Sequence, residues 1–228
     1  MELIKVDSIS KNYGKKEVLK SISFSSGAGE CIGIIGPNGC GKSTLLKILQ
    51  GSLKPASGSL SYNGCNPLAS PKYFSEYIGY VPQDNPLFAN LSVLDNLKLW
   101  YCDSTHNLKD DIESGIIAEF KINTYLKEKV KNLSGGMKKR LSIACAIAKD
   151  PQILIMDEPG ASLDIIAKND IVNYIKKYIS QGGTVIISSH EECELAVCTR
   201  TYLINNGVLE LLDGTPDMSY IAERMKNL

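Results

Sequence analysis

A glycine-rich run near the N-terminus has the composition and spacing of a phosphate-binding loop. Residues 36–44 fit the pattern G-x-x-x-x-G-K-[ST]. Glycines let successive backbone N–H groups approach phosphate oxygens, where a side chain would block the approach. In this pattern the lysine reaches the outer phosphates and the following hydroxyl is placed on Mg²⁺. The run therefore predicts a nucleotide site built from Gly36, Pro37, Asn38, Gly39, Cys40, Gly41, Lys42, Ser43 and Thr44.

Two acidic residues, Asp157 and Glu158, end an apolar run that begins near residue 152. If this run is a buried strand, the acids emerge at its carboxyl end, where ligands bind in open α/β sheets. Asp157 is then suited to the coordination of Mg²⁺, and Glu158 to polarising an attacking water. A capped loop after a strand would explain the same pair, so the assignment depends on its companions.

Two weaker features complete the chemistry. His190 follows the apolar run 184–189 and is one of two histidines; it could reach a terminal phosphate or be a satisfied structural residue. Residues 133–137 read Leu-Ser-Gly-Gly-Met, in which Ser134 is a good N-cap. Gly135 and Gly136 leave N–H groups bare at the positive end of a helix, although a capped helix start alone would look the same.

The elements that must position these residues alternate between strands and helices. We expect strands at 2–7, 19–25, 30–35, 77–81, 152–157 and 184–189, and a hairpin over 201–212 that turns at Asn206-Gly207. We expect helices at 43–50 and 165–179, the second stopping at Gly182-Gly183. Its apolar face is predicted to carry Ile165, Ile166, Val172, Ile175 and Ile179. Between 84 and 149 the apolar residues recur at helical spacing, which predicts a helical insert.

In this order, the motifs resemble the nucleotide-binding domain of ATP-binding cassette (ABC) transporters over nearly the whole chain. The loop at 36–44 is similar to Walker A, 133–137 to the signature motif and 153–158 to Walker B. Three shorter runs resemble the remaining family motifs: Lys11–Gly14 the A-loop, Tyr80–Gln83 the Q-loop and Ser162–Asp164 the D-loop.

The resemblance implies a P-loop NTPase fold, with a parallel-sheet core, an antiparallel β subdomain and a helical insert. Residues 1–83 and 150–228 would form the core, and 84–149 the helical subdomain that carries the signature motif. The implied cofactors are ATP and Mg²⁺.

The resemblance also assigns roles to single residues. Tyr13 would stack on adenine, and Gln83 would touch Mg²⁺ and the catalytic water. The implied catalytic residues are Glu158, His190, Gln83 and Lys42, and the implied metal ligands are Ser43, Gln83 and Asp157. Two copies would pack head to tail, so that Ser134, Gly135 and Gly136 of one copy close over the ATP of the other.

The sequence departs from the family pattern twice. Met137 stands where the signature usually has glutamine, which puts some strength of the closed dimer in doubt. Ala161 stands where the D-loop usually has a serine or threonine, which removes one hydroxyl from the dimer interface. Neither change touches the predicted catalytic residues, so we expect an active ATPase.

Composition limits where the chain works and with what. Its 228 residues carry 25 basic and 25 acidic side chains, and this neutral balance gives no electrostatic footprint for nucleic acid. The longest apolar run, Ile143–Ala148, is far shorter than the roughly 20 residues that span a bilayer. The acidic start argues against a secretory signal, and seven cysteines without a Cys-x-x-Cys pair favour free thiols in a reducing cytoplasm.

By resemblance, the protein would lie on the cytoplasmic face of the membrane, with an integral membrane transporter subunit as a separate chain. That subunit would dock near Gln83 and Asp84–Leu91. The partner cassette would be identical or different, and the compact single cassette favours an exporter over an importer. Two alternatives stay open: a soluble ABC ATPase that acts on nucleic acid or ribosomes, and a small-molecule kinase on the same phosphate loop.

Overall fold

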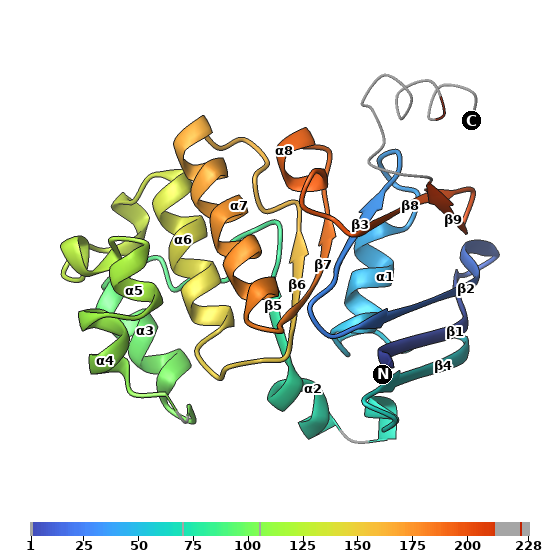
Figure 1. Cartoon of the computed structure of the whole chain (residues 1–228), viewed down its shortest axis with the longest axis horizontal. Coiled ribbons are helices and arrows are strands. Elements are labelled where there is room, and N and C mark those ends of the chain that lie inside the picture. Colours follow the sequence, from blue (N-terminus) through green and yellow to red (C-terminus); the bar gives the residue numbers. More distant parts are fainter. Residues whose placement is uncertain (1, 70, 105, 213–223, 225–228) are drawn as a thin grey trace.

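The computed structural model describes residues 2–69, 71–104, 106–212 and 224, and these form two β-sheets with helices around them (Figure 1). The larger sheet has the order β5-β6-β7-β3-β8-β9, and its neighbouring strands are parallel except for the antiparallel pair β8 and β9. Its strands are β3 (Cys31–Ile35), β5 (Ile78–Val81), β6 (Ile153–Asp157), β7 (Thr184–Ser188), β8 (Arg200–Asn205) and β9 (Val208–Leu212). Because β3, β6 and β7 are adjacent and parallel, their carboxyl ends meet at one edge.

The smaller sheet is antiparallel, in the order β2-β1-β4. Its strands are β1 (Glu2–Tyr13), β2 (Lys16–Gly27) and β4 (Ser57–Tyr62). The first two run well past the predicted 2–7 and 19–25, because irregular pairing lets both strands continue through polar residues. Tyr13 consequently lies at the far end of β1, beside the turn into β2.

The helices follow the predicted pattern. Helix α1 (Lys42–Leu49) comes directly after the glycine loop, and α7 (Ile165–Ser180) connects β6 with β7. Residues 84–149 are mostly helical, as expected. They contain α3 (Val93–Tyr101), α4 (Leu108–Glu113), α5 (Ile116–Glu119), α6 (Gly135–Ala146) and short 3₁₀ turns at Ile122–Tyr125 and Val130–Asn132. Two short helices, α2 (Pro71–Tyr77) and α8 (Glu192–Leu195), and a 3₁₀ turn at Pro67–Ala69 complete the described chain.

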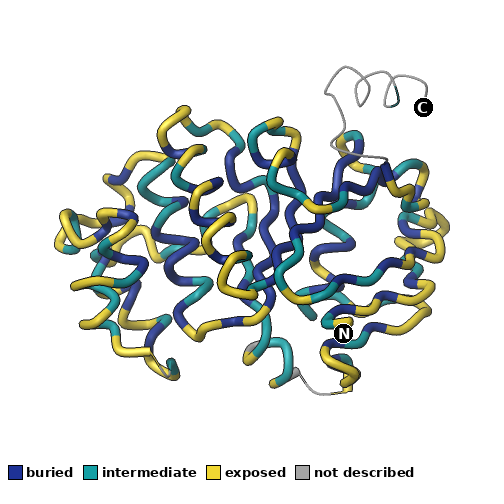
Figure 2. Tube along the Cα trace, in the orientation of Figure 1, coloured by how far each residue is buried: buried dark blue, intermediate teal, exposed yellow. Residues whose placement is uncertain are grey.

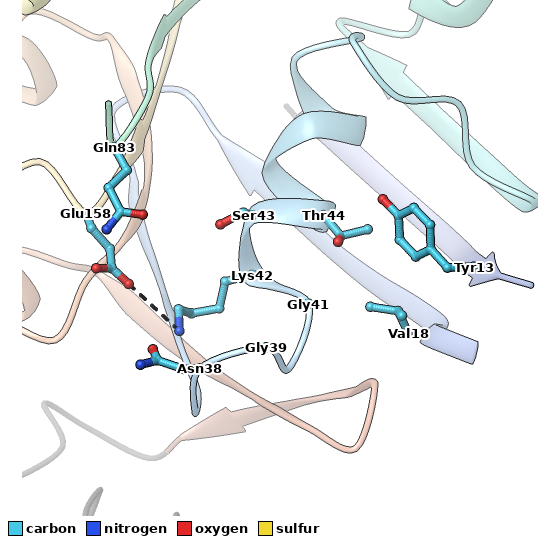
Figure 3. A pocket seen from close by; sticks show the side chains of 10 residues that line it. All are labelled: Tyr13, Val18, Asn38, Gly39, Gly41, Lys42, Ser43, Thr44, Gln83 and Glu158. Atoms are coloured by element: carbon cyan, nitrogen blue, oxygen red, sulfur yellow. Dashed lines mark ion pairs between the residues drawn. The ribbon is translucent and has the colours of Figure 1, made fainter. Parts of the chain in front are cut away.

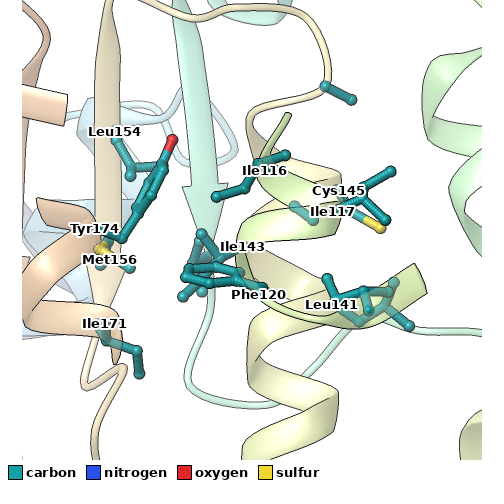
Figure 4. Close-up of a cluster of buried hydrophobic side chains, with 14 of the residues drawn as sticks. Ile116, Ile117, Phe120, Leu141, Ile143, Cys145, Leu154, Met156, Ile171 and Tyr174 are labelled. Atoms are coloured by element: carbon teal, nitrogen blue, oxygen red, sulfur yellow. The ribbon is translucent and has the colours of Figure 1, made fainter. Parts of the chain in front are cut away.

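The larger sheet separates two hydrophobic cores. Its strands β3, β6 and β7 are buried along their whole length (Figure 2). Side chains alternate across a strand, so Leu154 and Met156 of β6 face one core while Ile153 and Ile155 face the other. The first core joins the sheet to α7 and the helical insert, as in the cluster of Figure 4. The second packs α1 between the two sheets. Both faces being covered explains why these parallel strands are continuously apolar.

The arrangement confirms the predicted fold class: a mainly parallel sheet with an antiparallel β part and a helical insert. The hairpin turn is also confirmed, since Asn206 and Gly207 both have positive φ, 48° and 82°, as a type I′ turn requires. Strand β4 lies outside the predicted strands, because the serine and glycine at its start, Ser57 and Gly58, are typical of a loop.

One prediction about α7 is wrong. Ile165 and Ile166 were placed on its buried face, but they are 76% and 70% exposed. The first turn of α7 projects beyond the core, and the helix buries a face of Ala167, Ile171, Val172, Tyr174, Ile175 and Tyr178 instead. Its end is as predicted, with Gly182 at φ 92° just after the last turn.

Candidate functional site

The glycine loop between β3 and α1 has the backbone that its sequence predicts. Gly36, Gly39 and Gly41 have φ of 153°, 79° and 117°, a region that side chains strongly disfavour. At Gly36 a Cβ would lie only 2.6 Å from the carbonyl oxygen of Ile204 and 2.7 Å from the Cys40 sulfur. The loop therefore needs glycine there both for its torsion and for its packing against β8.

Lys42 lies at the centre of the site with only 6% of its surface exposed. Its ammonium donates to the carbonyl oxygen of Gly36 at 2.7 Å and to that of Pro37 at 3.4 Å. The nearest carboxylate is Glu158, whose Oε1 lies 3.9 Å from Nζ. The positive charge is thus held inside the curve of the loop, facing the end of β6.

A pocket of about 500 Å³ opens in front of this lysine (Figure 3). Tyr13 borders one side of the pocket, Lys42 lies in the middle, and Gln83 and Glu158 lie opposite Tyr13. The remaining lining residues are Val18, Asn38, Gly39, Gly41, Ser43 and Thr44. Segments that are distant in sequence therefore meet at one cavity.

Three predicted loop residues lie outside this lining. Pro37 and Cys40 line a neighbouring polar pocket of about 240 Å³, together with the β8–β9 turn. The Cys40 thiol points under the loop toward Gly36, and burial raises its pKa. Gly36 contributes the carbonyl that holds Lys42. These residues shape the loop from behind.

The acid pair is organised by Ser188, which the sequence analysis missed. Its hydroxyl donates to Asp157 Oδ1 at 2.5 Å. The N–H of Glu158 points at the Ser188 carbonyl at 3.0 Å and at its hydroxyl at 3.1 Å. These bonds hold Glu158 at φ 45°, a conformation that costs a non-glycine residue about 1–3 kcal/mol and is typical of functional sites. The only signal in the sequence is that Ser188 ends a buried strand.

His190 lies beside Glu158, as its place after β7 predicted. Its Nε2 is 3.7 Å from Glu158 Oε1, and its side chain is 39% exposed. Burial lowers the pKa of His190, the Lys42 charge lowers it further, and Glu158 opposes both. The lowered pKa favours the neutral imidazole at pH 7, in which one ring nitrogen donates a hydrogen bond and the other accepts one.

The signature residues form a second, separate group. The Ser134 hydroxyl caps α6 by accepting from the Met137 N–H at 3.2 Å, as predicted. Gly135 is exposed, and a Cβ on Gly136 would meet Ala167 of α7 at 3.0 Å. None of these residues lines the pocket around Lys42. Within the described part of one chain, the predicted site residues are therefore divided between two places.

The side chains at the pocket carry oxygen atoms that suit a magnesium ion. Ser43 and Gln83 line the pocket, and Asp157 lies at the adjoining end of β6. Their hydroxyl, amide and carboxylate present the oxygen ligands that Mg²⁺ prefers. The described residues contain no group of three or more His, Cys, Asp or Glu side chains that could hold a metal. A single carboxylate with a hydroxyl and an amide would suit Mg²⁺, which proteins usually hold through one or two carboxylates together with substrate phosphates.

Two further observations concern the chain as a whole. All seven cysteines are free thiols. The Cys31 thiol donates a hydrogen bond to the sulfur of Cys198, 3.6 Å away. In the described segments, no helix combines the length and the apolar character needed to cross a membrane.

Comparison with known proteins identifies the family. Residues 19–161 match the family described as ABC transporter. The chain is 33% identical over 220 residues to Nod factor export ATP-binding protein I of Rhizobium etli, covering 95% of this chain and 69% of that protein. It is equally identical over 220 residues to the linearmycin resistance ATP-binding protein LnrL of Bacillus subtilis, covering 95% and 70%.

Solved structures agree with this. An ATP-binding subunit of an ABC transporter superposes with a TM-score of 0.83 at 27% identity, covering 92% of this chain and 90% of that one. A dimeric ATP-binding cassette in a post-hydrolysis state, bound to ADP and Pi, gives 0.82 at 25%, covering 92% and 99%. The chain belongs to the ABC transporter family, and it is an ATP-binding subunit that hydrolyses ATP.

Proposed function

We propose that this subunit binds Mg-ATP in the pocket around Lys42 and couples its hydrolysis to export through a separate membrane polypeptide. The observation that carries the proposal is the convergence of Tyr13, Lys42, Gln83 and Glu158 on one 500 Å³ cavity. In this order, an aromatic ring can stack on the base of ATP, a cation can bind its phosphates and a carboxylate can activate the water that attacks them. A small-molecule kinase would leave the separate signature group without a purpose.

Each side of the pocket has its own task in this proposal. Tyr13 is 51% exposed at the rim, and Lys11 Nζ lies over its ring at 5.8 Å from the centroid, so adenine would stack on the exposed part of the ring. The glycine loop and the N-terminus of α1 offer N–H groups to the phosphates. Lys42 exchanges its present neighbours for the outer phosphates, and its charge stabilises the negative charge that develops during transfer.

The opposite wall carries the hydrolytic chemistry. Ser43, Gln83 and Asp157 would hold Mg²⁺, which neutralises phosphate charge when it is bound. Glu158 accepts the proton of the attacking water, because its carboxylate follows the end of β6 and lines the pocket. His190, neutral and beside Glu158, contacts the terminal phosphate.

A second copy of a cassette completes the site. Ser134, Gly135 and Gly136 lie away from the pocket of their own chain, and Ser134 and Gly135 are exposed. Head-to-tail packing would bring them over the ATP of the partner. We include in this proposal that residues 84–149 act as the subdomain that carries the signature group, with 1–83 and 150–228 as the core.

A second cavity suits the membrane partner. A largely apolar pocket of about 470 Å³ lies between β5, the segment after it and the helical insert, and we call it the insert groove. It is lined by Gln50, Ile78, Gly79, Tyr80, Pro82, Pro86, Leu99, Trp100, Asp103, Cys145, Ala146, Lys149 and Pro151. We propose that it receives a short helical segment of the membrane subunit, which places this chain on the cytoplasmic face of the membrane. Export is favoured because the relatives above are named for export and drug resistance.

A capture experiment with matched variants tests this function. Tagged Glu158→Gln protein, incubated with Mg-ATP and detergent-solubilised membranes of the source cell, should retain a stoichiometric polytopic membrane protein. Adding Leu99→Asp in the insert groove should release it, whereas Leu211→Asp on β9 should not. The two leucines are matched in exposure, at 52% and 50%. Capture of ribosomal proteins or nucleic acid alone would contradict the transport function.

A further inference from the structure

A buried lysine connects two motifs that the proposed function treats separately. Lys139 lies in α6, the helix that starts at the signature residues, and only 3% of its surface is exposed. Its ammonium donates to the backbone carbonyl oxygens of Pro82 and Gln83, each at 3.0 Å. The bonds therefore join the signature helix to the segment that follows β5.

The position is costly for a lysine. Lysine side chains ordinarily extend their charged ends into water, and burying an ammonium is unfavourable unless its donors are satisfied. In the described chain no carboxylate lies within ion-pair distance of Lys139. Burial lowers its pKa, while the more distant charges of Asp157, Asp84 and Glu194 oppose that shift. An apolar residue would pack here at lower cost, so stability alone does not explain the lysine.

The segment that Lys139 holds packs against the first core through Leu87 but makes few hydrogen bonds to other elements. Within the described residues, the two bonds from Lys139 are the only hydrogen bonds that join residues 82–87 to another element. The same segment has two faces, because Gln83 lines the ATP pocket while Pro82 and Pro86 line the insert groove. Its backbone position thus affects both cavities.

We infer that Lys139 is a positioning residue that fixes the Pro82–Gln83 backbone to α6. Through it, Gln83 in the ATP pocket, the proline wall of the insert groove and the signature residues at the start of α6 shift as one unit. The inference rests on the proposed function for the meaning of those three sites. Lys139 itself lines neither the ATP pocket nor the insert groove.

Methionine at this position tests the inference. Lys139→Met keeps the length and packing of the side chain but removes both bonds. We expect kcat for ATP to fall about tenfold, while KM for ATP stays within about twofold because the nucleotide contacts remain. Lys139→Gln, whose amide can still donate to a carbonyl, should recover part of the rate and also serves if the methionine variant does not fold.

Trp100 supplies a readout that does not depend on catalysis. It is the single tryptophan of the chain and lines the insert groove together with Pro82 and Pro86. Loosening of the proline wall in Lys139→Met should make its fluorescence more easily quenched by acrylamide. The matched control is Lys138→Met, since Lys138 makes no side-chain hydrogen bond or ion pair with the described residues. It should leave both readouts unchanged.

The outcomes separate this inference from the proposed function. Absence of ATP hydrolysis by the wild-type protein would refute the function, while the quenching comparison would still test Lys139. Unchanged quenching in Lys139→Met would overturn the positioning role, whatever its rate. Increased quenching with a wild-type kcat would overturn the link to catalysis. If Lys139→Met lost thermal stability and had a raised KM but an unchanged kcat, Lys139 would have a merely structural role, and the inference would be overturned as well.

Discussion

Replacing Gly135 with alanine separates the signature group's role in the fold from its role in catalysis. The residue is exposed at the start of α6, and a Cβ there would meet only the Leu163 side chain, at an ordinary 3.5 Å. Alanine favours a helix over glycine by up to about 1 kcal/mol. The free energy of unfolding of Gly135→Ala, measured with urea, should therefore equal or slightly exceed that of the wild-type protein.

ATP hydrolysis should respond in the opposite direction. In the proposed dimer the bare N–H groups near Gly135 face the terminal phosphate of the partner's ATP, and a methyl group would block that approach. Removing one preorganised donor of this kind costs about 10²–10³ in kcat. The steady-state rate of phosphate release at saturating Mg-ATP should fall by that order, although the protein is fully folded.

Mixing two inactive variants tests whether the group acts across the dimer. Gly135→Ala lacks the signature contact but keeps Lys42, and Lys42→Ala has the opposite defect. If two identical copies pack head to tail, a mixed dimer contains one intact site, so the mixture should hydrolyse ATP where neither variant does alone. No recovery, or a wild-type rate in Gly135→Ala by itself, would refute this reasoning. Reduced stability of Gly135→Ala would refute its packing argument.

Three further changes give distinct expectations. Glu158→Gln should lower hydrolysis at least about hundredfold while equilibrium dialysis still detects ATP binding, because only the proton acceptor is lost; a wild-type rate would contradict its role as the base. Gly36→Ala should lower the free energy of unfolding measured with urea and the affinity for ATP measured by titration, since its Cβ would lie 2.6 Å from the backbone oxygen of Ile204. Retained ATP affinity would contradict the claim that the loop cannot adjust to a side chain there. Burial raises the pKa of Glu194 to about 7 from 4.5, with the Ser189 hydroxyl opposing that shift. The folded chain thus keeps a proton that the unfolded chain loses between these values, and Glu194 destabilises the fold increasingly as pH rises through this window. Glu194→Gln should consequently raise the free energy of unfolding by up to about 3 kcal/mol at pH 8 but hardly at pH 4.5, and an equal gain at both would exclude the titration.

The parts of the fold that could be predicted are those whose cause is local. Buried parallel strands read as apolar runs because both faces of the sheet are covered, and glycines after α7 and in the β8–β9 turn mark positive φ. Strand β4 could not be predicted, because its polar start pairs only through the presence of β1, with Ser57 opposite Ser10 and Ser59 opposite Asp7. The exposure of Ile165 and Ile166 likewise depends on how far α7 extends past the sheet.

The same distinction applies to the site. The glycine loop and the acid pair are each a short continuous run of residues, so the sequence alone indicates their chemistry. Ser188 and Lys139 act on partners that are distant along the chain, and each looks ordinary where it stands. A lysine inside a helix is usually solvated, and nothing local marks Lys139 as buried against two carbonyls. Such residues emerge only when the topology brings their partners to them.

The charges around Lys42 indicate why binding must precede hydrolysis. Its ammonium lies 3.9 Å from Glu158, and His190 lies 3.7 Å from the same carboxylate oxygen. Within the described chain, Glu158 is the carboxylate that lies within ion-pair distance of this ammonium. A terminal phosphate draws the ammonium toward itself, because a phosphate carries more negative charge than a carboxylate. In the proposed site Glu158 then loses this neighbour at the moment when a water has a phosphate to attack. One cation thereby links occupancy of the pocket to the release of Glu158 from its ion pair, and Lys42→Arg, which cannot move between the two partners in the same way, should hydrolyse ATP slowly even when it binds it.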